Sequence, residues 1–247
     1  MYFIANMYQM LYNIIIIKGG NKMSELEEND FIQTDSKSFI SKTFLWMFLG
    51  LLVTGIISVF TYNSGLLENI IYSNMFAVIA IIEIVVVLVF SLLFRKLSAT
   101  AVSILYFVYA ILNGFGLSVI FATFQLESVY LLFFVSALVF GIFAFIGYKT
   151  KFDLTKVGNI LFALLLAGII ISIINLFLGN TILDIALSWF ILILFFGITA
   201  YDMQRIKRWS QVPEFQAEKL HIYAAMEIYL DFINIFIRLL SIFGKRK

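Results

Sequence analysis

The chain has 247 residues, of which 62% are hydrophobic and 13% are charged, and its formal net charge is +2. Soluble domains are about 45–50% apolar and about 25% charged, so this composition excludes a sizeable soluble domain and predicts an all-α integral membrane protein. The absence of cysteine and the single histidine exclude disulfides, thiolate chemistry and a metal site built from several histidines.

The N-terminal 42 residues divide into two segments. Residues 1–22 end shortly after Lys18-Gly19-Gly20, which can be encoded by a bacterial ribosome-binding sequence. We therefore expect Met23 to be the native start and residues 1–22 to be a translated leader, the alternative being an amphipathic N-terminal extension. Residues 23–42 are polar and acidic, and they predict a short cytoplasmic tail before a membrane domain that covers residues 43–247.

Seven apolar stretches follow, each close to the roughly twenty residues that a membrane-spanning helix needs. Because open sheet edges are not stable in hydrocarbon, all seven are predicted to be helices. Their approximate ranges are 43–62, 75–94, 101–124, 129–148, 157–178, 182–201 and 220–243.

The seventh stretch carries polar residues at helical spacing. Glu227 is followed after four, seven and eleven residues by Asp231, Asn234 and Arg238. This spacing places all four side chains on one helical face. A charge that faces lipid at the bilayer centre costs at least about 2.5 kcal/mol. We therefore expect six helices to surround a central C-terminal helix. The alternative is a helix on the membrane surface with this face in water.

Basic residues predict the orientation of the chain. Nine of them follow the second, fourth and sixth stretches, namely Arg95, Lys96, Lys149, Lys151, Lys156, Arg205, Lys207, Arg208 and Lys219. By the positive-inside rule these loops and the N-terminus face the cytoplasm. A seventh span would place the basic residues 245–247 outside, so a re-entrant course is the alternative to the span that we favour.

Asp202 lies at the predicted end of the sixth helix, in line with Thr199 at helical spacing. One hypothesis is that Asp202 meets Asp231 inside the bundle. The other is that Asp202 is solvated at the cytoplasmic interface or pairs with Arg205 one turn later.

Four other ionisable residues lie in or next to the apolar stretches. Three of them have two possible roles, and the fourth is not expected to belong to a site. Glu83, in the middle of the second stretch, either hydrogen-bonds between helices or lines an ion path. Arg95 either pairs with Asp202 or extends to lipid headgroups. Arg238 either pairs with a neighbour on its own helix face or extends outward. His221 is predicted to be an interfacial residue and not part of a site.

Several membrane chemistries are excluded by the residues present. A retinal Schiff base needs a lysine in the last helix, which has none between residues 220 and 243. The single histidine lies at the start of that helix and cannot complete a serine–histidine pair inside the membrane. We therefore expect no enzyme, and no nucleic-acid partner, since no basic run alternates with aromatic residues. Buried carboxylates are typical of cation passage or proton coupling.

Four segments resemble the Bax inhibitor (transmembrane Bax inhibitor motif) family. They are IYLDFINIF at 228–236, TAYDMQRIK at 199–207, GYKTKFDL at 147–154 and NGFGLS at 113–118. The resemblance extends over roughly residues 44–243, and the two aspartate motifs are its most specific part.

This resemblance implies six helices around a seventh and a pH-dependent calcium leak. The gate would be a hydrogen-bonded aspartate pair, here Asp202 and Asp231, which would also contact Ca²⁺ transiently. Arg95 matches by position an arginine that latches onto the first aspartate, and Glu83 matches an acidic residue of the second helix. No cofactor is implied beyond the transported ion, and the family's cell-death role is not expected in a bacterium.

We therefore expect a monomeric, multi-pass calcium leak channel of the inner (cytoplasmic) membrane, with an ion path along Glu83, Glu227 and Asn234. Its partners would be Ca²⁺, protons and the lipid bilayer, and a second membrane protein is a further candidate partner. One alternative is a Ca²⁺/H⁺ exchanger that uses the same carboxylates. Another is a scaffold or regulator of a membrane protease that passes no ions, in which buried polar residues only join helices.

The expected direction of gating follows from the aspartate pair. Two adjacent carboxylates in a low dielectric resist double ionisation, so one proton is lost only at high pH. The resulting Asp202 anion would hold Arg95 and close the path. We therefore expect the leak to increase as the pH falls from about 8 to about 6.

Overall fold

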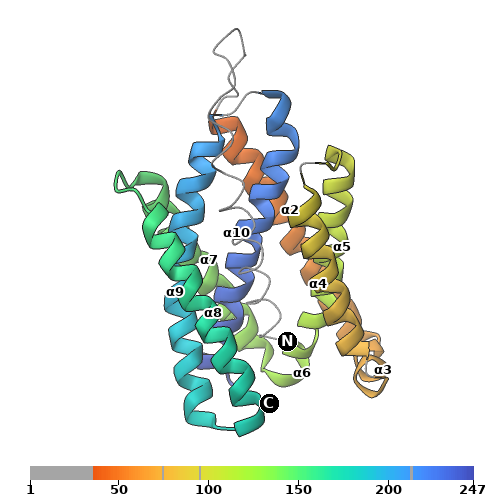
Figure 1. Cartoon of the computed structure of the whole chain (residues 1–247). Coiled ribbons are helices and arrows are strands. Elements are labelled where there is room, and N and C mark those ends of the chain that lie inside the picture. The colour runs from red at the N-terminus through yellow and green to blue at the C-terminus, as the bar shows by residue number, and fades with distance from the viewer. Residues whose placement is uncertain (1–35, 74, 95, 212–213) are drawn as a thin grey trace.

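The computed structural model describes residues 36–73, 75–94, 96–211 and 214–247. In this part of the chain every extended regular element is a helix (Figure 1). The predicted leader and residues 23–35 of the predicted tail lie outside the described residues. In chain order the helices are α2 (Ser36–Asn63), α3 (Leu66–Tyr72), α4 (Met75–Leu93), α5 (Ala99–Leu117), α6 (Val119–Thr123), α7 (Leu126–Lys149), α8 (Thr155–Leu178), α9 (Thr181–Trp209) and α10 (Glu214–Phe243).

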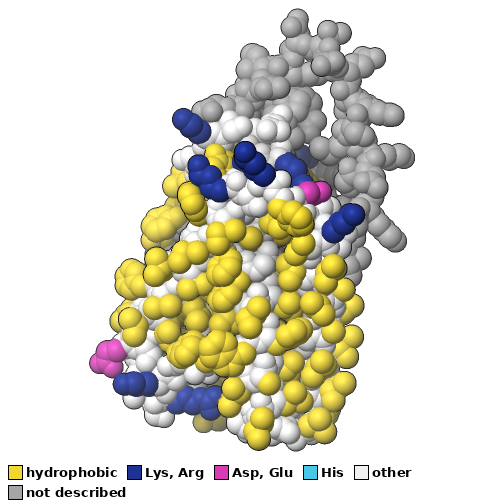
Figure 2. All heavy atoms as spheres, turned by 90° about the vertical axis from the view of Figure 1, so that its left-hand side faces the viewer, with side chains coloured by type: hydrophobic (Ala, Val, Ile, Leu, Met, Phe, Trp, Pro, Cys, Tyr) yellow, Lys and Arg dark blue, Asp and Glu magenta, His cyan; other side chains and the backbone are white. Residues whose placement is uncertain are grey.

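Five segments of this bundle are long and apolar enough to cross a membrane: α2, α5 with α6, α7, α8 and α9. Helices α3 and α4 make a sixth candidate if their bend of 92° belongs to one span. Figure 2 shows hydrophobic side chains covering one side of the molecule between two ends that carry Lys and Arg. Phe134, Leu138, Ile160 and Ile193 are each at least 60% exposed. Soluble monomers rarely expose such a continuous apolar surface, so the predicted class of all-helical membrane protein is confirmed.

The helices extend beyond the apolar stretches that predicted them. Helix α2 begins at Ser36 instead of residue 43, inside the predicted polar tail, and α10 begins at Glu214 instead of residue 220. Helix α9 continues to Trp209, so Asp202 lies within this helix and not at its end as predicted. Hydrophobicity marks only the apolar part of a helix, whereas the backbone ladder continues through polar residues that tolerate helical dihedrals.

Two breaks were not predicted. The stretch expected as one helix over 101–124 is divided at Ser118 into α5 and α6, and the Ser118 hydroxyl donates to the Phe115 carbonyl at 2.6 Å. A short polar side chain that bonds to nearby backbone competes with the regular helical ladder. The loop after α2 contains the short helix α3, which begins after Gly65 in a left-handed conformation (φ 74°) that glycine adopts without strain.

Helix α10 passes through the bundle from one end to the other (Figure 1). It packs against α2, α5, α7 and α9, and residues 221–240 are buried throughout. At its far end the Gln125 amide donates to the Lys245 carbonyl (2.9 Å), and the Lys247 amide donates to the Thr123 carbonyl (3.0 Å). The chain therefore ends beside the loop between α6 and α7. Helix α10 is therefore one continuous helix over Glu214–Phe243.

Helices α7 and α9 are in close contact at Gly147. A Cβ atom at this position would overlap the backbone carbonyl of Ala200 on α9, which cannot move aside without moving its helix. Gly147→Ala is therefore expected to lower the free energy of unfolding by about 1–3 kcal/mol, as overpacked sites do. Thermal unfolding of the purified protein in detergent measures this loss.

Gly141, on the same helix, provides the matched control. A Cβ at position 141 would meet nothing within 4 Å, so Gly141→Ala is expected to leave stability unchanged or to increase it. Equal unfolding temperatures for the two variants would contradict the close packing of α7 against α9.

Candidate functional site

Two helices bring four ionisable side chains together inside the bundle. Helix α9 supplies Asp202 and Arg205, and α10 supplies Glu227 and Asp231. Arg205 Nη2 lies 2.9 Å from Asp202 Oδ1 and also contacts Glu227 Oε1. Asp231 lies within electrostatic range of Asp202, Glu227 and Arg205. We call these four residues the charged cluster.

Helical spacing and burial together define this cluster. Residues three or four apart share a helix face, as Asp202 and Arg205 do on α9 and as Glu227 and Asp231 do on α10. The three carboxylates are 0% exposed, and the Arg205 side chain is 6% exposed. Buried ions are tolerated only when they are paired with good geometry. The charged cluster therefore brings three carboxylates and one guanidinium together in a buried position.

Arg205 is held on both sides by aromatic rings of its own helix. Its guanidinium carbon lies 5.1 Å from the centre of the Tyr201 ring and 4.9 Å from that of Trp209. Guanidinium groups at such distances are attracted to the negative face of an aromatic ring. Arg205 therefore has two kinds of partner, the carboxylates of the charged cluster and the rings one turn away in each direction.

The two predicted aspartates are neighbours in the structure. The Asp202 and Asp231 carboxyls are close enough to interact electrostatically, and the Asp231 side chain also hydrogen-bonds with the Thr199 side chain. Asp202 also makes the ion pair with Arg205 that was the competing hypothesis. The prediction that Asp202 is solvated at the interface is wrong, because this residue is fully buried.

Two contacts of α10 with other helices were not predicted from the sequence. The pairing of Arg205 with Glu227 depends on the relative rotation of two helices, which spacing within either helix does not reveal. The Tyr229 hydroxyl lies 2.7 Å from Thr54 Oγ1 on α2, and Thr54 in turn donates to the Ala110 carbonyl on α5 at 2.9 Å. Tyr229 lies two residues before Asp231, so this bond fixes α10 against α2 and α5 beside the charged cluster.

Three other predicted site residues are not members of the charged cluster. Glu83 is 5% exposed and lines a cavity of about 400 Å³ between α4, α5 and α6, where it interacts electrostatically with Tyr229. Asn234 is buried, and its amide donates to the Leu230 carbonyl of its own helix at 2.8 Å. Arg95, the predicted latch, lies outside the described residues.

Two residues of α10 differ from their predicted surroundings. Arg238 is only 3% exposed, so its side chain does not extend outward to the membrane surface. His221, predicted to be interfacial, is 8% exposed and packs against the rings of Phe39 and Trp46 at centroid distances of 6.3 and 6.2 Å. In both cases α10 is more deeply enclosed by its neighbours than its own sequence indicates.

No group of three or more His, Cys, Asp or Glu side chains within the described ranges is arranged to hold a metal ion. Ca²⁺ takes six to eight oxygen ligands, whereas in the charged cluster a guanidinium lies against two of the three carboxylates. In this conformation Arg205 is therefore the counter-ion of Asp202 and Glu227.

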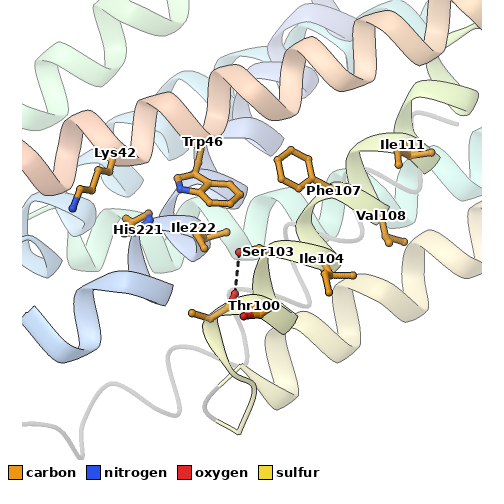
Figure 3. A pocket seen from close by; sticks show the side chains of 11 residues that line it. Lys42, Trp46, Thr100, Ser103, Ile104, Phe107, Val108, Ile111, His221 and Ile222 are labelled. Carbon is orange, nitrogen blue, oxygen red and sulfur yellow. Dashed lines mark hydrogen bonds between the residues drawn. The ribbon is translucent and has the colours of Figure 1, made fainter.

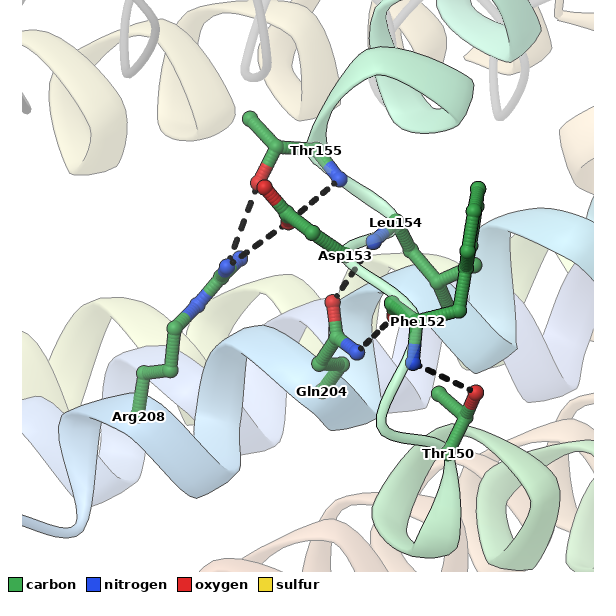
Figure 4. Close-up of polar contacts among 7 residues, drawn as sticks. All are labelled: Thr150, Phe152, Asp153, Leu154, Thr155, Gln204 and Arg208. Atoms are coloured by element: carbon green, nitrogen blue, oxygen red, sulfur yellow. Dashed lines mark hydrogen bonds and ion pairs between the residues drawn. The ribbon is translucent and has the colours of Figure 1, made fainter.

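The loop between α7 and α8 is attached to α9 next to the cluster (Figure 4). The Leu154 amide donates to Gln204 Oε1 at 2.9 Å, and Gln204 Nε2 donates to the Phe152 carbonyl at 2.7 Å. Asp153 accepts hydrogen bonds from the Thr155 amide and hydroxyl, which, with a weaker contribution from Arg208, hold the pKa of Asp153 below its usual range. These contacts stabilise the loop at neutral pH and are lost as the pH falls through that lowered pKa.

Gln204 is expected to be the main attachment of this loop. Gln204→Ala removes both hydrogen bonds and leaves two backbone groups without their partner, so we expect trypsin to cleave the exposed Lys151 several-fold faster. Arg208→Gln is the control, since its ion pair with Asp153 is solvent-exposed and such pairs contribute about 0–1 kcal/mol. If both variants are cleaved as slowly as the wild type, Gln204 does not hold the loop.

Comparison with known proteins identifies the family. The family model described as inhibitor of apoptosis-promoting Bax1 matches residues 36–247. The chain is 34% identical over 217 residues to the inner membrane protein YbhL of Escherichia coli K12, an alignment that covers 85% of this chain and 93% of YbhL. It is 31% identical over 229 residues to the protein RP147 of Rickettsia prowazekii, covering 91% of this chain and 97% of that protein. It is also 40% identical over 167 residues to the membrane protein SpyM3_0260 of Streptococcus pyogenes, an alignment that covers 67% of this chain and 72% of that protein. With its helices and both aspartate motifs in the matched region, this chain belongs to the Bax inhibitor family of membrane proteins.

Proposed function

We propose that this protein is a pH-sensitive leak channel for Ca²⁺ and related cations, gated by protonation of the Asp202–Asp231 pair. The observation that carries the proposal is the charged cluster, in which three carboxylates from two helices share one guanidinium in a fully buried position. Ionisable groups inside a membrane protein are costly and typically mark ion or proton pathways. The inner-membrane location of the relative YbhL supports the same location for this chain.

In the proposed architecture seven helices span the membrane and six of them surround α10. The burial of α10 along residues 221–240 and the position of its C-terminal residues beside the α6–α7 loop support this count. The N-terminus faces the cytoplasm together with the basic loops after α4, α7 and α9. The protein acts as a monomer, without catalytic groups or a resident cofactor.

Arg205 keeps the proposed path closed. Its guanidinium contacts Asp202 and Glu227, so it occupies the position between carboxylates that a passing cation would need. The latch that the family resemblance assigned to Arg95 stays a separate prediction, since Arg95 lies outside the described residues. The attraction is strongest when Asp202 is ionised, since burial reduces screening by water.

Protonation opens the path by weakening the hold on this arginine. When the Asp202–Asp231 pair takes up a proton, the negative charge around Arg205 decreases while its attraction to the rings of Tyr201 and Trp209 remains. The guanidinium then moves away from the carboxylates toward those rings, and Ca²⁺ passes along Glu83, Glu227 and Asn234. Because further protonation also weakens the attraction for Ca²⁺, the leak decreases again at still lower pH.

The test is Ca²⁺ uptake into liposomes that contain only the purified protein. The pH is set equal on both sides with a protonophore, and a trapped dye reports Ca²⁺ entry down its own gradient. We expect uptake under these conditions, because a channel needs no opposing proton flux. Uptake that depends on a proton gradient would identify a Ca²⁺/H⁺ exchanger. The absence of uptake at every pH would favour a scaffold or protease regulator in which the polar residues only join helices.

A further inference from the structure

A second cavity lies at the end of the bundle where α2, α5 and α10 begin (Figure 3). Its volume is about 670 Å³, within the range of small-molecule sites. It is separate from the charged cluster, since none of the four cluster residues lines it. The lining residues are Lys42, Trp46, Ala99, Thr100, Ser103, Ile104, Phe107, Val108, Ile111, His221 and Ile222.

Polar groups gather at one end of this cavity. Figure 3 shows Lys42 of α2 and His221 of α10 next to each other there. Lys42 is exposed, and no carboxylate in the described part of the chain forms an ion pair with it. Thr100 belongs to the first turn of α5, where the helix dipole adds partial positive charge. This end of the cavity is therefore positively charged and open.

The other end of the cavity is an apolar strip. Ile104, Val108 and Ile111 follow one another along α5 at spacings of four and three residues, and they are 58%, 37% and 36% exposed. The rings of Trp46 and Phe107, whose centres are 5.5 Å apart, form a wall beside the strip. A ligand that matches both ends must have an anionic group joined to an extended hydrocarbon chain.

We propose that this cavity binds one anionic phospholipid, with its phosphate at Lys42 and His221 and one acyl chain along the strip on α5. The position supports this occupant, because the cavity lies toward the end of the bundle where the basic loops are, and basic segments beside a membrane surface attract anionic headgroups. A lipid without net charge would bring no anion to Lys42, and a soluble phosphate would make no contact with the apolar strip. The proposal is independent of ion passage.

The test compares two lipids on the purified full-length protein by native mass spectrometry. Phosphatidylglycerol and phosphatidylcholine with identical acyl chains are added to the protein in detergent, and retained lipids are counted. We expect one retained phosphatidylglycerol, with a preference over phosphatidylcholine of about fivefold for each basic group that contacts it. Lys42→Gln should reduce this preference about fivefold, and Lys42→Arg should restore it.

Two further arms distinguish a phospholipid in this cavity from lipid held elsewhere on the protein and from a soluble phosphate. Lys156→Gln, which changes an exposed basic residue that does not line the cavity, should keep the preference. Ile104→Trp fills the strip and should reduce retention of both lipids, whereas millimolar glycerol phosphate should displace neither. The proposal is overturned if Lys42→Gln behaves like Lys156→Gln, if Ile104→Trp retains lipid as the wild type does, or if glycerol phosphate alone competes.

Discussion

Asp231→Asn is expected to remove most of the pH dependence of Ca²⁺ leak between about pH 8 and about pH 6. Asparagine keeps the size and hydrogen-bonding groups of aspartate but cannot ionise, so the charged cluster remains packed and loses a titrating group. If gating is coupled to one proton by about 1.4 kcal/mol, wild-type leak changes about tenfold over this range. The variant should change less than about twofold, as measured by dye-reported uptake into liposomes.

The same measurement on Asp202→Asn and on the double variant tests whether the two aspartates act as a pair. Carboxyls that interact lose their protons in coupled steps, so removing either one should remove most of the effect. We expect the double variant to differ from the product of the single effects by at least about fivefold, which corresponds to a coupling of about 1 kcal/mol. Effects that multiply independently would show that Asp202 and Asp231 do not form one sensor.

Asp184→Asn is the control for both aspartate variants. Asp184 lies in the first turn of the same helix α9 but is exposed and distant in sequence from the charged cluster. Its pH profile should match the wild type. An Asp184→Asn profile as flat as that of Asp231→Asn would mean that the pH dependence does not originate in the cluster.

Removing the Arg205 charge is expected to open the path at high pH. Arg205→Gln alone leaves buried carboxylates without their counter-ion, a change that costs about 3–5 kcal/mol and can unfold the protein. The informative variant is therefore Arg205→Gln combined with Glu227→Gln, which removes the cation and one anion together. Because Glu227 also lies on the proposed ion path, the comparison is with Glu227→Gln alone, whose leak at about pH 8 the double variant should exceed several-fold.

Two further variants define the role of this arginine. Arg205→Lys keeps the charge but loses the planar group that reaches two carboxylates at once, so its leak at high pH should be intermediate. Arg208→Gln, one turn later on α9, removes an exposed arginine and should leave the leak unchanged. If the compensated double variant is as tight as Glu227→Gln alone at high pH, Arg205 does not close the path.

Much of the fold follows directly from the sequence, because apolar stretches of about twenty residues mark membrane helices. The helix ends cannot be predicted from hydrophobicity. Polar residues with favourable helical propensity, such as Arg205 and Lys207, continue α9 beyond its apolar part. The break at Ser118 coincides with a side-chain bond to the Phe115 carbonyl, which no periodicity indicates.

The charged cluster could be predicted only in part, because spacing within one helix reveals shared faces but not contacts between helices. The face that contains Glu227 and Asp231 can be read from spacing along one helix, and the aspartate motifs point to Asp202. The contact between Arg205 and Glu227 depends on how α9 and α10 are rotated relative to each other, which the residue spacing within either helix does not contain. Likewise, Lys42 and His221 are far apart in sequence and meet only because α2 and α10 begin at the same end of the bundle.

The most direct test of the gating mechanism is the pH profile of Ca²⁺ uptake by the wild-type protein in pure liposomes, with equal pH on both sides. We expect low uptake at about pH 8, a rise of about tenfold by about pH 6 and a decline at lower pH, because protonation first releases Arg205 and then weakens the attraction for Ca²⁺. Uptake that is independent of pH, or that rises steadily with pH, would contradict gating by the Asp202–Asp231 pair.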